Sequence, residues 1–231
     1  MSRVKKLYLI LRAIPNTLYF NLRYFHPRLA MRLPVWVSHR VVLLRTQGSV
    51  RLEGAIWPAK IRIGFGEVGI FDADRSRSIW DVTGEVIFKG RAHIGHGAKL
   101  SVAGQLTLGD EFTITAESTI VCDKEIRIGD NCLLSWDVLI MDTDHHDFCD
   151  RGGRVINPDK AVIIGDNVWI GCRSLLLKGS VVPSHSVVGA NTFLNKPMVG
   201  ENILIAGNPA RKIRGDIYRA TQVIPPGVGE N

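Results

Sequence analysis

The sequence predicts an all-β solenoid, in which short strands and tight corners wind into stacked triangular coils. Within residues 94–199 an aliphatic residue recurs every six positions, whereas a helix would repeat about every 3.6 positions and a strand every two. Gly residues and Asp-Asn pairs stand between these positions, and they tolerate the positive φ that tight corners need. Repetition at a fixed period is typical of a solenoid, here with three hexapeptides in each coil.

The aliphatic positions form two runs separated by a break. The first run comprises Ile94, Leu100, Leu108, Ile114, Ile120, Ile128, Leu134 and Ile140. The second run comprises Ile164, Ile170, Leu176, Val182, Val188 and Leu194. Small or medium-sized residues follow most of them by four positions, as Cys132 follows Ile128. We expect these repeat positions to face the interior of the solenoid.

Residues 1–48 are predicted to form a basic amphipathic helical segment ahead of the repeats. Apolar residues at helical spacing in this segment are Leu7, Ile10, Leu11, Ile14 and Leu18. Pro15, Pro27 and Pro34 are expected to divide it into short pieces. Residues 1–52 hold ten of the 29 Lys and Arg residues and no acid, so the remainder carries 19 basic and 22 acidic residues and is close to neutral.

Two interpretations of this segment remain open, and they are compatible. It could cap the open end of the solenoid, because such ends need covering. Its basic, aromatic and amphipathic character is also typical of an interfacial anchor, so residues 1–45 could contact a membrane surface. We expect no nucleic-acid partner.

The remaining chain is expected to comprise the β-helix domain (49–213) and a loose C-terminal tail (214–231). The charged stretch 146–161 contains Gly-Gly and Pro and lacks aliphatic residues at the six-residue phase, so we predict a long excursion loop there. Residues 72–80 are expected to bulge out. The four cysteines have no paired metal spacing, which favours reduced thiols and a cytoplasmic protein. No apolar run of about 20 residues is present.

Two adjacent histidines, His145 and His146, stand where the repeat breaks, within a run of Asp residues. Imidazole exchanges a proton near neutral pH, and a neighbouring carboxylate can fix its tautomer. The pair is therefore a candidate catalytic base, and a solvated polar corner is the alternative.

The C-terminal motifs resemble the hexapeptide-repeat acyltransferases, and most closely the sugar O-acetyltransferases. The segments that carry the resemblance are 164–171 (Ile-Gly-Asp-Asn-Val-Trp-Ile-Gly), Gly189-Ala190-Asn191, Lys196 and Gly207-Asn-Pro-Ala-Arg211. The resemblance covers roughly residues 94–213. It implies a left-handed parallel β-helix, a homotrimer, and transfer of an acetyl group from acetyl-CoA to a sugar hydroxyl without a metal cofactor.

The resemblance also implies roles for individual residues. His145 would be the general base, with His146 and Asp144 beside it in the catalytic group. The acetyl-CoA contacts would be Trp169, Gly171, Cys172, Ala190, Lys196 and Arg211. The acceptor contacts would be Thr115, Trp136 and Asp142. Thr115 replaces an Asn of the maltose-type enzymes, and Ser135-Trp136-Asp137 replaces a Gly-rich corner, so acceptor identity does not carry over.

The basic N-terminal segment favours an acceptor near a membrane, such as a lipid-linked saccharide of capsule or O-antigen biosynthesis. The protein would then be cytoplasmic and peripheral on the inner face of the membrane. Alternatives are N-acetylation of an amino-sugar nucleotide, a zinc carbonic anhydrase-like enzyme built on the same solenoid, and a non-catalytic scaffold. The zinc alternative would need three converging histidines, with His93, His96, His145 and His146 as the candidates.

Overall fold

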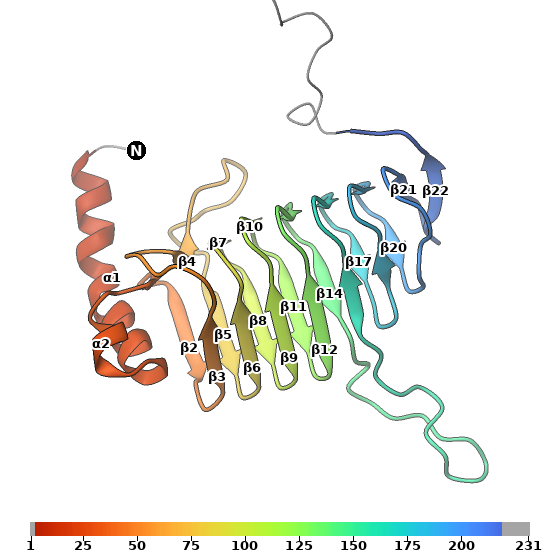
Figure 1. The fold of residues 1–231 in the computed structure, drawn as a ribbon, viewed down its shortest axis with the longest axis horizontal. Coiled ribbons are helices and arrows are strands. Elements are labelled where there is room, and N and C mark those ends of the chain that lie inside the picture. Colours follow the sequence, from red (N-terminus) through yellow and green to blue (C-terminus); the bar gives the residue numbers. More distant parts are fainter. Residues whose placement is uncertain (1–2, 219–231) are drawn as a thin grey trace, which may run out of the picture.

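The chain forms a parallel β-helix with a helix across one end and a long loop near the other (Figure 1). The structure is a computed structural model that describes residues 3–218. Three sheets run along the solenoid, and their strands pair in parallel. The exception is β21 with β22, an antiparallel pair at the end of the first sheet. The predicted all-β solenoid is confirmed.

The three sheets, here called sheets A, B and C, receive successive strands in rotation. Sheet A contains β1 (Val35–Val37), β4 (Ile61–Phe65), β7 (Ala92–His96), β10 (Phe112–Ala116), β13 (Leu133–Leu134), β16 (Trp169–Ile170), β19 (Val187–Val188), β21 (Leu204–Ala206) and β22 (Arg211–Arg214). Sheet B contains β2 (Val41–Arg45), β5 (Ser78–Val82), β8 (Lys99–Val102), β11 (Thr119–Cys122), β14 (Leu139–Met141), β17 (Leu175–Leu176) and β20 (Phe193–Leu194). Sheet C contains β3 (Ser49–Leu52), β6 (Glu85–Phe88), β9 (Gln105–Leu108), β12 (Glu125–Ile128), β15 (Val162–Ile164) and β18 (Val181–Val182).

The coil length changes along the solenoid, which corrects the single period expected for residues 94–199. Ile114 pairs with Ile94, so the coil between them has 20 residues. Val182 pairs with Ile164, which gives 18 residues. The strict hexapeptide therefore holds only after the loop. Earlier coils have longer strands in sheets B and C, and their corner between these sheets accommodates two further residues.

The predicted inward-facing residues form the core. All fourteen aliphatic residues of the two runs are at most 2% exposed, and Cys132 is 1% exposed. Buried hydroxyl groups in this core bond to corner carbonyls, as the Ser118 Oγ does to Ser135 O (2.8 Å) and the Ser174 Oγ to Gly189 O (2.9 Å). Polar groups inside the solenoid are thus used to hold successive corners together.

The corner between sheets C and A is held by a ladder of aspartates. The Asp130 amide donates to the Asp166 carboxylate (2.8 Å), and the Asp110 amide donates to the Asp130 carboxylate (2.7 Å). Asn131 and Asn167 follow with φ of 54° and 58°, as expected for these corners. Each aspartate therefore supports the backbone of the preceding coil.

The N-terminal helical segment is shorter than predicted. Helix α1 spans Arg3–Tyr24 without a break, and α2 spans Pro27–Ala30. Pro15 lies inside α1 instead of dividing it. From residue 35 the chain is already in the solenoid as β1 and β2, because this stretch is rich in Val, a residue that favours strands.

Helix α1 covers the open end of the solenoid, so the capping interpretation is confirmed. The Asn21 side chain donates to Val35 O (2.6 Å) and accepts from Val35 N (3.3 Å). The Thr17 hydroxyl likewise bonds both backbone groups of Val37 (3.3 and 3.0 Å). Two side chains one helical turn apart thereby satisfy the exposed edge of β1, the first strand of sheet A.

Aromatic packing reinforces this cap. Phe20 is fully buried and meets the Trp80 ring edge-on at 5.0 Å. The Trp80 indole N–H donates to the Tyr24 hydroxyl (2.9 Å). Burial raises the Tyr24 pKa above its ordinary value of 10.0, so this hydroxyl stays protonated at neutral pH.

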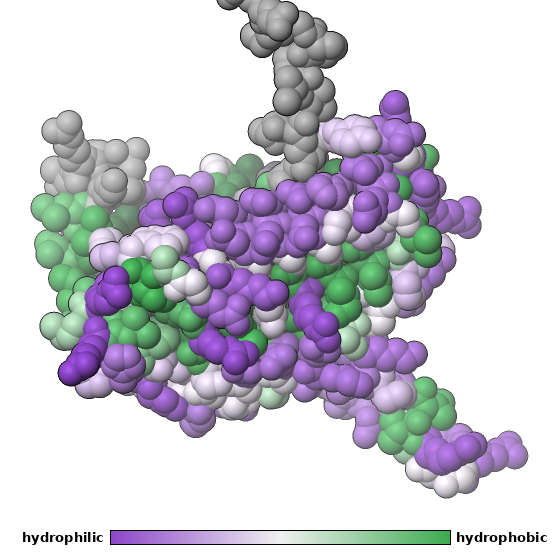
Figure 2. Space-filling model, in the orientation of Figure 1, coloured by the Kyte–Doolittle hydropathy of each residue, from purple (hydrophilic) through white to green (hydrophobic). Residues whose placement is uncertain are grey.

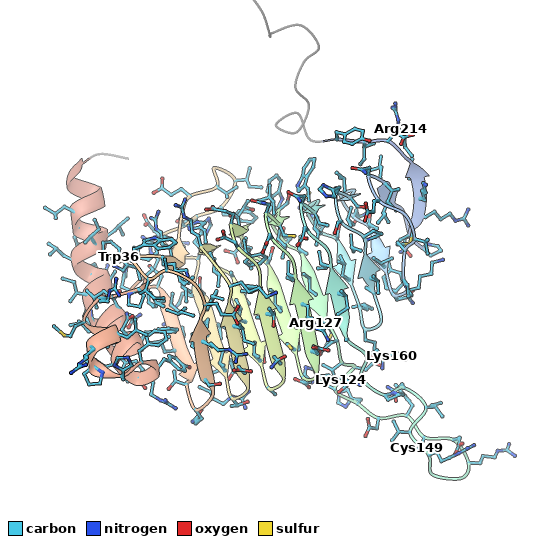
Figure 3. The ribbon with its side chains drawn as sticks, in the orientation of Figure 1. Trp36, Lys124, Arg127, Cys149, Lys160 and Arg214 are labelled. Carbon is cyan, nitrogen blue, oxygen red and sulfur yellow. The ribbon has the colours of Figure 1, made fainter. Side chains whose placement is uncertain are left out.

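Between β14 and β15 the chain leaves the solenoid over residues 142–161, which include the predicted loop 146–161. The loop extends away from the body as a narrow hairpin with Cys149 far out, whereas Lys124 and Lys160 lie at its base (Figure 3). A single bridge between Cys149 and Val155 closes it. Residues 66–77 form a second excursion between β4 and β5.

The four cysteines are free thiols, as the sequence favoured. Burial raises the pKa of the Cys122 thiol far above its ordinary value, so it behaves as a small apolar core residue. The predicted tail from 214 includes the end of β22, and its residues from 219 onward, with Pro225-Pro226-Gly227, lie outside the described range.

Replacing Asn21 by Ala is expected to destabilise the protein by about 1–3 kcal/mol, because both backbone groups of Val35 would lose their partner in a buried setting. The measurement is urea unfolding at fixed protein concentration. Leu22→Ala is the matched control, since this neighbour on α1 is 61% exposed. Equal midpoints for the two variants would contradict a capping role for Asn21.

Candidate active site at the base of the excursion loop

His145 stands at the first turn of the excursion loop, directly after β14. Ile140 is the last core residue of that strand, and Asp142 and Thr143 remain buried before the chain turns outward. The His145 backbone has φ of 56° and its amide donates to the Thr143 hydroxyl (3.0 Å). The turn thus directs a half-exposed imidazole away from the core.

The His145 imidazole faces a carboxylate from the preceding coil. Its Nδ1 lies 3.1 Å from the Asp123 Oδ2, and the two side chains are 49% and 28% exposed. Asp123 sits at the corner between β11 and β12. A neutral imidazole that donates from Nδ1 keeps its lone pair on Nε2, so this pair can accept a proton at Nε2 while the carboxylate stabilises the resulting cation.

The carboxylate beside His145 was expected among its sequence neighbours, and that expectation is wrong. Asp144 instead pairs with Lys178 (2.5 Å) and accepts from the Asn157 side chain (2.8 Å). Hydrogen bonds from Lys178 and then Asn157 hold the Asp144 pKa below its ordinary value of 3.8. Asp144 therefore ties the loop to the next coil and does not contact His145.

His146 is exposed, and its carbonyl accepts from the Asn157 side chain (2.8 Å). Its ring has no hydrogen bond or ion pair with any residue in the described range. Lys178 also bonds Asn157 O, so Asp144, Asn157 and Lys178 form one network. The backbone of His146 belongs to this network, whereas its imidazole has no structural partner to orient it.

Asp142 was expected to contact the acceptor, but its carboxylate is fully buried. It accepts the backbone N–H groups of Asp123 (2.8 Å), Lys124 (3.0 Å) and Glu125 (2.6 Å). Both oxygens are thereby occupied. Asp142 fixes the corner that carries Asp123, and it is a positioning residue and not a surface for a sugar.

The residues expected to contact acetyl-CoA gather mainly at the edge between sheets A and B. Trp169 is 42% exposed, and its indole N–H donates to the Ser135 hydroxyl (3.0 Å). Cys172 O accepts from the Asn191 amide (2.9 Å), beside exposed Ala190. A Cβ on Gly171 would lie 2.6 Å from the Ala190 amide nitrogen, so only glycine fits there. Small residues therefore stand beside a partly exposed indole at this edge.

The remaining predicted residues are dispersed. Thr115 and Trp136 lie at the same edge as Trp169, and the Thr115 hydroxyl is buried without a partner. Arg211 is exposed at the start of β22 in sheet A. Lys196 follows β20 and therefore lies at the edge between sheets B and C, the edge that carries His145.

One chain does not bring His145 and Trp169 together. His145 lies at the edge between sheets B and C, and Trp169 lies next to the edge between sheets A and B, so the width of sheet B separates them. The catalytic and acetyl-CoA candidates can form one site only if a second copy supplies one of them.

The histidines that a zinc site would need are also dispersed. His93 and His96 lie on β7 in sheet A, far from the corner that carries His145. Burial lowers the His93 pKa to about 4, so this side chain is neutral at physiological pH. Within residues 3–218, no three His, Cys, Asp or Glu side chains are grouped so as to hold a metal ion.

Three residues of this site, Asp123, Asn157 and Lys178, were not predicted from the sequence. Asp123 and Lys178 occupy the same corner as His145 in neighbouring coils. Asp123 precedes His145 by 22 positions, about one coil of the earlier type. Counting one 20-residue coil back from His145 reaches Glu125, so it would have indicated the corner that holds Asp123 but not Asp123 itself.

No protein-family model matches this chain. The chain is 32% identical over 117 residues to the galactoside O-acetyltransferase of Escherichia coli (strain K12), covering 49% of this chain and 56% of that protein. It is 34% identical over 118 residues to the polysialic acid O-acetyltransferase of Escherichia coli O1:K1, covering 50% and 38%. The crystal structure of the polySia-specific acetyltransferase NeuO superposes with a TM-score of 0.53 at 25% identity, covering 75% and 76%.

The resemblance to the hexapeptide-repeat sugar O-acetyltransferases is confirmed. So is the left-handed parallel β-helix that the resemblance implied. The chain spans about half the length, or less, of these two curated relatives. Neither described helix has the combination of length and apolar character that crossing a membrane requires.

Replacing Asp142 by Asn is expected to destabilise the protein by about 1–3 kcal/mol, because an amide NH₂ would face backbone donors in a buried site. Thermal unfolding at fixed protein concentration measures this. Asp147→Asn is the matched control, as an exposed aspartate of the same loop. If Asp142→Asn were as stable as this control, the buried carboxylate would not hold the corner.

Proposed function

We propose that this protein transfers an acetyl group from acetyl-CoA to a sugar hydroxyl, with His145 as the general base. The pairing of the His145 Nδ1 with the Asp123 carboxylate is the observation that carries this proposal. The similarity to a galactoside and a polysialic acid O-acetyltransferase supports the reaction class and a saccharide acceptor.

The chemistry follows from the free nitrogen of His145. The acceptor hydroxyl gives its proton to Nε2 while its oxygen attacks the thioester carbonyl carbon. The C–S bond breaks, the acetyl ester forms, and the proton passes from the imidazolium to the leaving thiolate. The Asp123 carboxylate stabilises the imidazolium between these steps. No covalent bond to the protein is needed, because a thioester is already activated and both substrates are held in place.

The edge beside Trp169 is proposed to hold the extended arm of acetyl-CoA. Its small corner residues are buried at Gly171, half-buried at Cys172 and exposed at Ala190. Arg211 lies at the end of the same sheet and is exposed, where its guanidinium could meet a phosphate. Lys196 lies at the edge between sheets B and C, so it would belong to the site to which its own chain supplies His145.

We further propose that the working assembly is a homotrimer with one site between each pair of subunits. The separation of His145 from Trp169 supports this, because a neighbouring copy must supply one of them. The protruding loop carries an apolar patch at Phe148 and Ile156, which are 63% and 62% exposed, and the patch is visible on the protrusion in Figure 2. A neighbouring subunit would cover this patch.

The acceptor is proposed to be a saccharide of surface polysaccharide biosynthesis, either free or linked to a lipid. The named substrates of the relatives, a galactoside and polysialic acid, support a saccharide. Thr115 and Trp136 lie at the same edge as the proposed acetyl-CoA contacts, so they would border an acceptor brought there by the partner's loop.

Replacing His145 by Ala is expected to lower kcat about 10²- to 10⁴-fold, the usual contribution of a general base. Acetyl-CoA binding and the melting temperature should change little, since the side chain is half-exposed. The assay measures acceptor-dependent release of the CoA thiol. His146→Ala is the matched control and should retain most activity.

Asp123→Asn tests the pair itself. It should lower kcat by a smaller factor than His145→Ala, because the imidazole remains but its cation loses a carboxylate. A larger loss in His146→Ala than in His145→Ala would show that the base is His146. Undiminished activity in His145→Ala would contradict the proposed mechanism.

A site shared between copies predicts complementation. His145→Ala and Trp169→Ala chains should each be weakly active alone, whereas co-assembly at equal amounts should restore about a quarter of the sites, because each site takes one residue from each neighbour. Activity of the mixture no higher than the mean of the two variants would place both residues in a site within one chain.

A further inference from the structure

Helix α1 has an inner face that forms the cap and an apolar outer face that the cap does not use. The inner face carries Ala13, Thr17, Phe20 and Asn21, all at most 6% exposed. The outer face carries a continuous stripe of aliphatic side chains, here called the outer stripe. Its members are Leu7, Leu11, Ile14, Leu18 and Leu22, which are 59%, 56%, 45%, 43% and 61% exposed.

No segment within residues 3–218 covers the outer stripe, since all five of its side chains are exposed. Its spacing of four, three, four and four residues keeps all five side chains on one side of the helix. Figure 2 shows this end of the molecule as a hydrophobic surface. Capping the solenoid requires only the inner face, so the cap gives no reason for an aliphatic outer face. An exposed apolar surface of this extent marks a binding site.

Aromatic and basic side chains flank the outer stripe. Tyr8 and Tyr19 are 53% and 52% exposed on one side of it. The Arg12 guanidinium stands 5.4 Å from the centre of the Tyr8 ring and donates to its hydroxyl (2.9 Å). Tyrosine and arginine beside an aliphatic face are the side chains that suit the boundary between acyl chains and lipid headgroups.

The sequence of this end is strongly basic, and several of its described arginines form no ion pair with a described residue. Residues 1–52 contain no acid. Further along the segment, Arg40 and Arg45 pair with Asp74 and Asp81. Four arginines on or just after the two helices lack such partners. Arg12 and Arg23 on α1, Arg28 on α2, and Arg32 form no ion pair within the described range.

We propose that the outer stripe of α1 docks onto an anionic lipid bilayer, with the helix lying in the interface plane. An apolar face bordered by unpaired arginines is complementary to acyl chains beneath anionic headgroups. A second copy is a poorer occupant, since two such ends would place eight unpaired arginines against each other. Docking through α1 does not depend on the proposed enzymatic function.

Docking through α1 would fix the height of His145 above the lipid. In sheet B, β14 lies four strands beyond β2, the first strand of that sheet. Neighbouring strands are about 4.8 Å apart and the helix radius is about 5 Å, which places His145 roughly 25 Å from the bilayer surface. Given the proposed function, this height suits a saccharide that extends from a lipid carrier.

The test is co-sedimentation of the full chain with vesicles. Vesicles of phosphatidylcholine with phosphatidylglycerol should bind the protein, and pure phosphatidylcholine vesicles should bind it far less. Raising the salt concentration should weaken binding, because it screens exposed charges. The double variant Leu11→Ser/Leu18→Ser should need at least about tenfold more lipid for half-binding, given the apolar area lost.

The matched control is Val199→Ser/Ile213→Ser, which removes two aliphatic side chains that are 85% and 60% exposed at the opposite end of the solenoid. It should bind vesicles as the wild type does. Arg23→Gln/Arg28→Gln should reduce binding to anionic vesicles only. Circular dichroism and thermal unfolding check that every variant is folded.

Three outcomes would overturn the proposal. The first is that the wild type does not bind anionic vesicles at low salt. The second is that the outer-stripe variant binds as tightly as the wild type. The third is that the control variant loses as much binding as the outer-stripe variant. If the outer-stripe variant instead changed the molar mass in solution, measured by light scattering, the stripe would be an interface between copies. Because no step measures acetyl transfer, failure here leaves the proposed activity untouched.

Discussion

Backbone hydrogen bonding between successive coils is the constraint on which the rest of this structure depends. A parallel strand has no partner on its own coil, so each coil is complete only when the next is in register. The aspartate ladder at one corner, with Asp130 accepting from Asp110 and donating to Asp166, supplies the same coupling outside the strands. An end of such a stack is necessarily unsatisfied, and α1 resolves this with the side chains of Thr17 and Asn21.

The same constraint explains how the candidate site is built. Residues 142–161 interrupt the coil at a corner, and the interruption is tolerated because β14 and β15 keep their pairing with neighbouring coils. The buried Asp142 carboxylate takes over the amides of the corner below. That bond places Asp123 within reach of His145. The hydrogen bonds that satisfy this corner therefore also position the carboxylate that can fix the tautomer of the imidazole.

The features that repeat along the sequence could be predicted from it, whereas contacts between residues of different coils could not. The inward positions could be predicted because burial selects aliphatic residues at each strand, and every one from Ile94 to Leu194 is buried. The partner of His145 could not be identified from residues adjacent to it in the sequence, because Asp123 lies on the preceding coil and approaches His145 only when the coils stack. The end of the helical segment was misplaced because Val35 and Val37 follow Pro34 in a stretch that also fits a broken helix. The outer stripe was visible as a helical spacing, but only the structure separates Leu11 and Leu18 from the capping face that holds Phe20.

A solenoid has two independent kinds of surface, its long edges and its ends, and the two proposals for this chain concern one of each. Its long edges carry His145 and Trp169, and because these lie on different edges the proposed site needs a second copy beside the first. Its end carries α1, whose exposed side points along the stacking direction (Figure 1). Copies that join through their edges leave the ends free, and a symmetric assembly with parallel solenoids presents all its outer stripes on one side. Weak contacts made together by linked copies add up to firm attachment. Side-by-side assembly would therefore strengthen membrane docking without altering a single contact of α1.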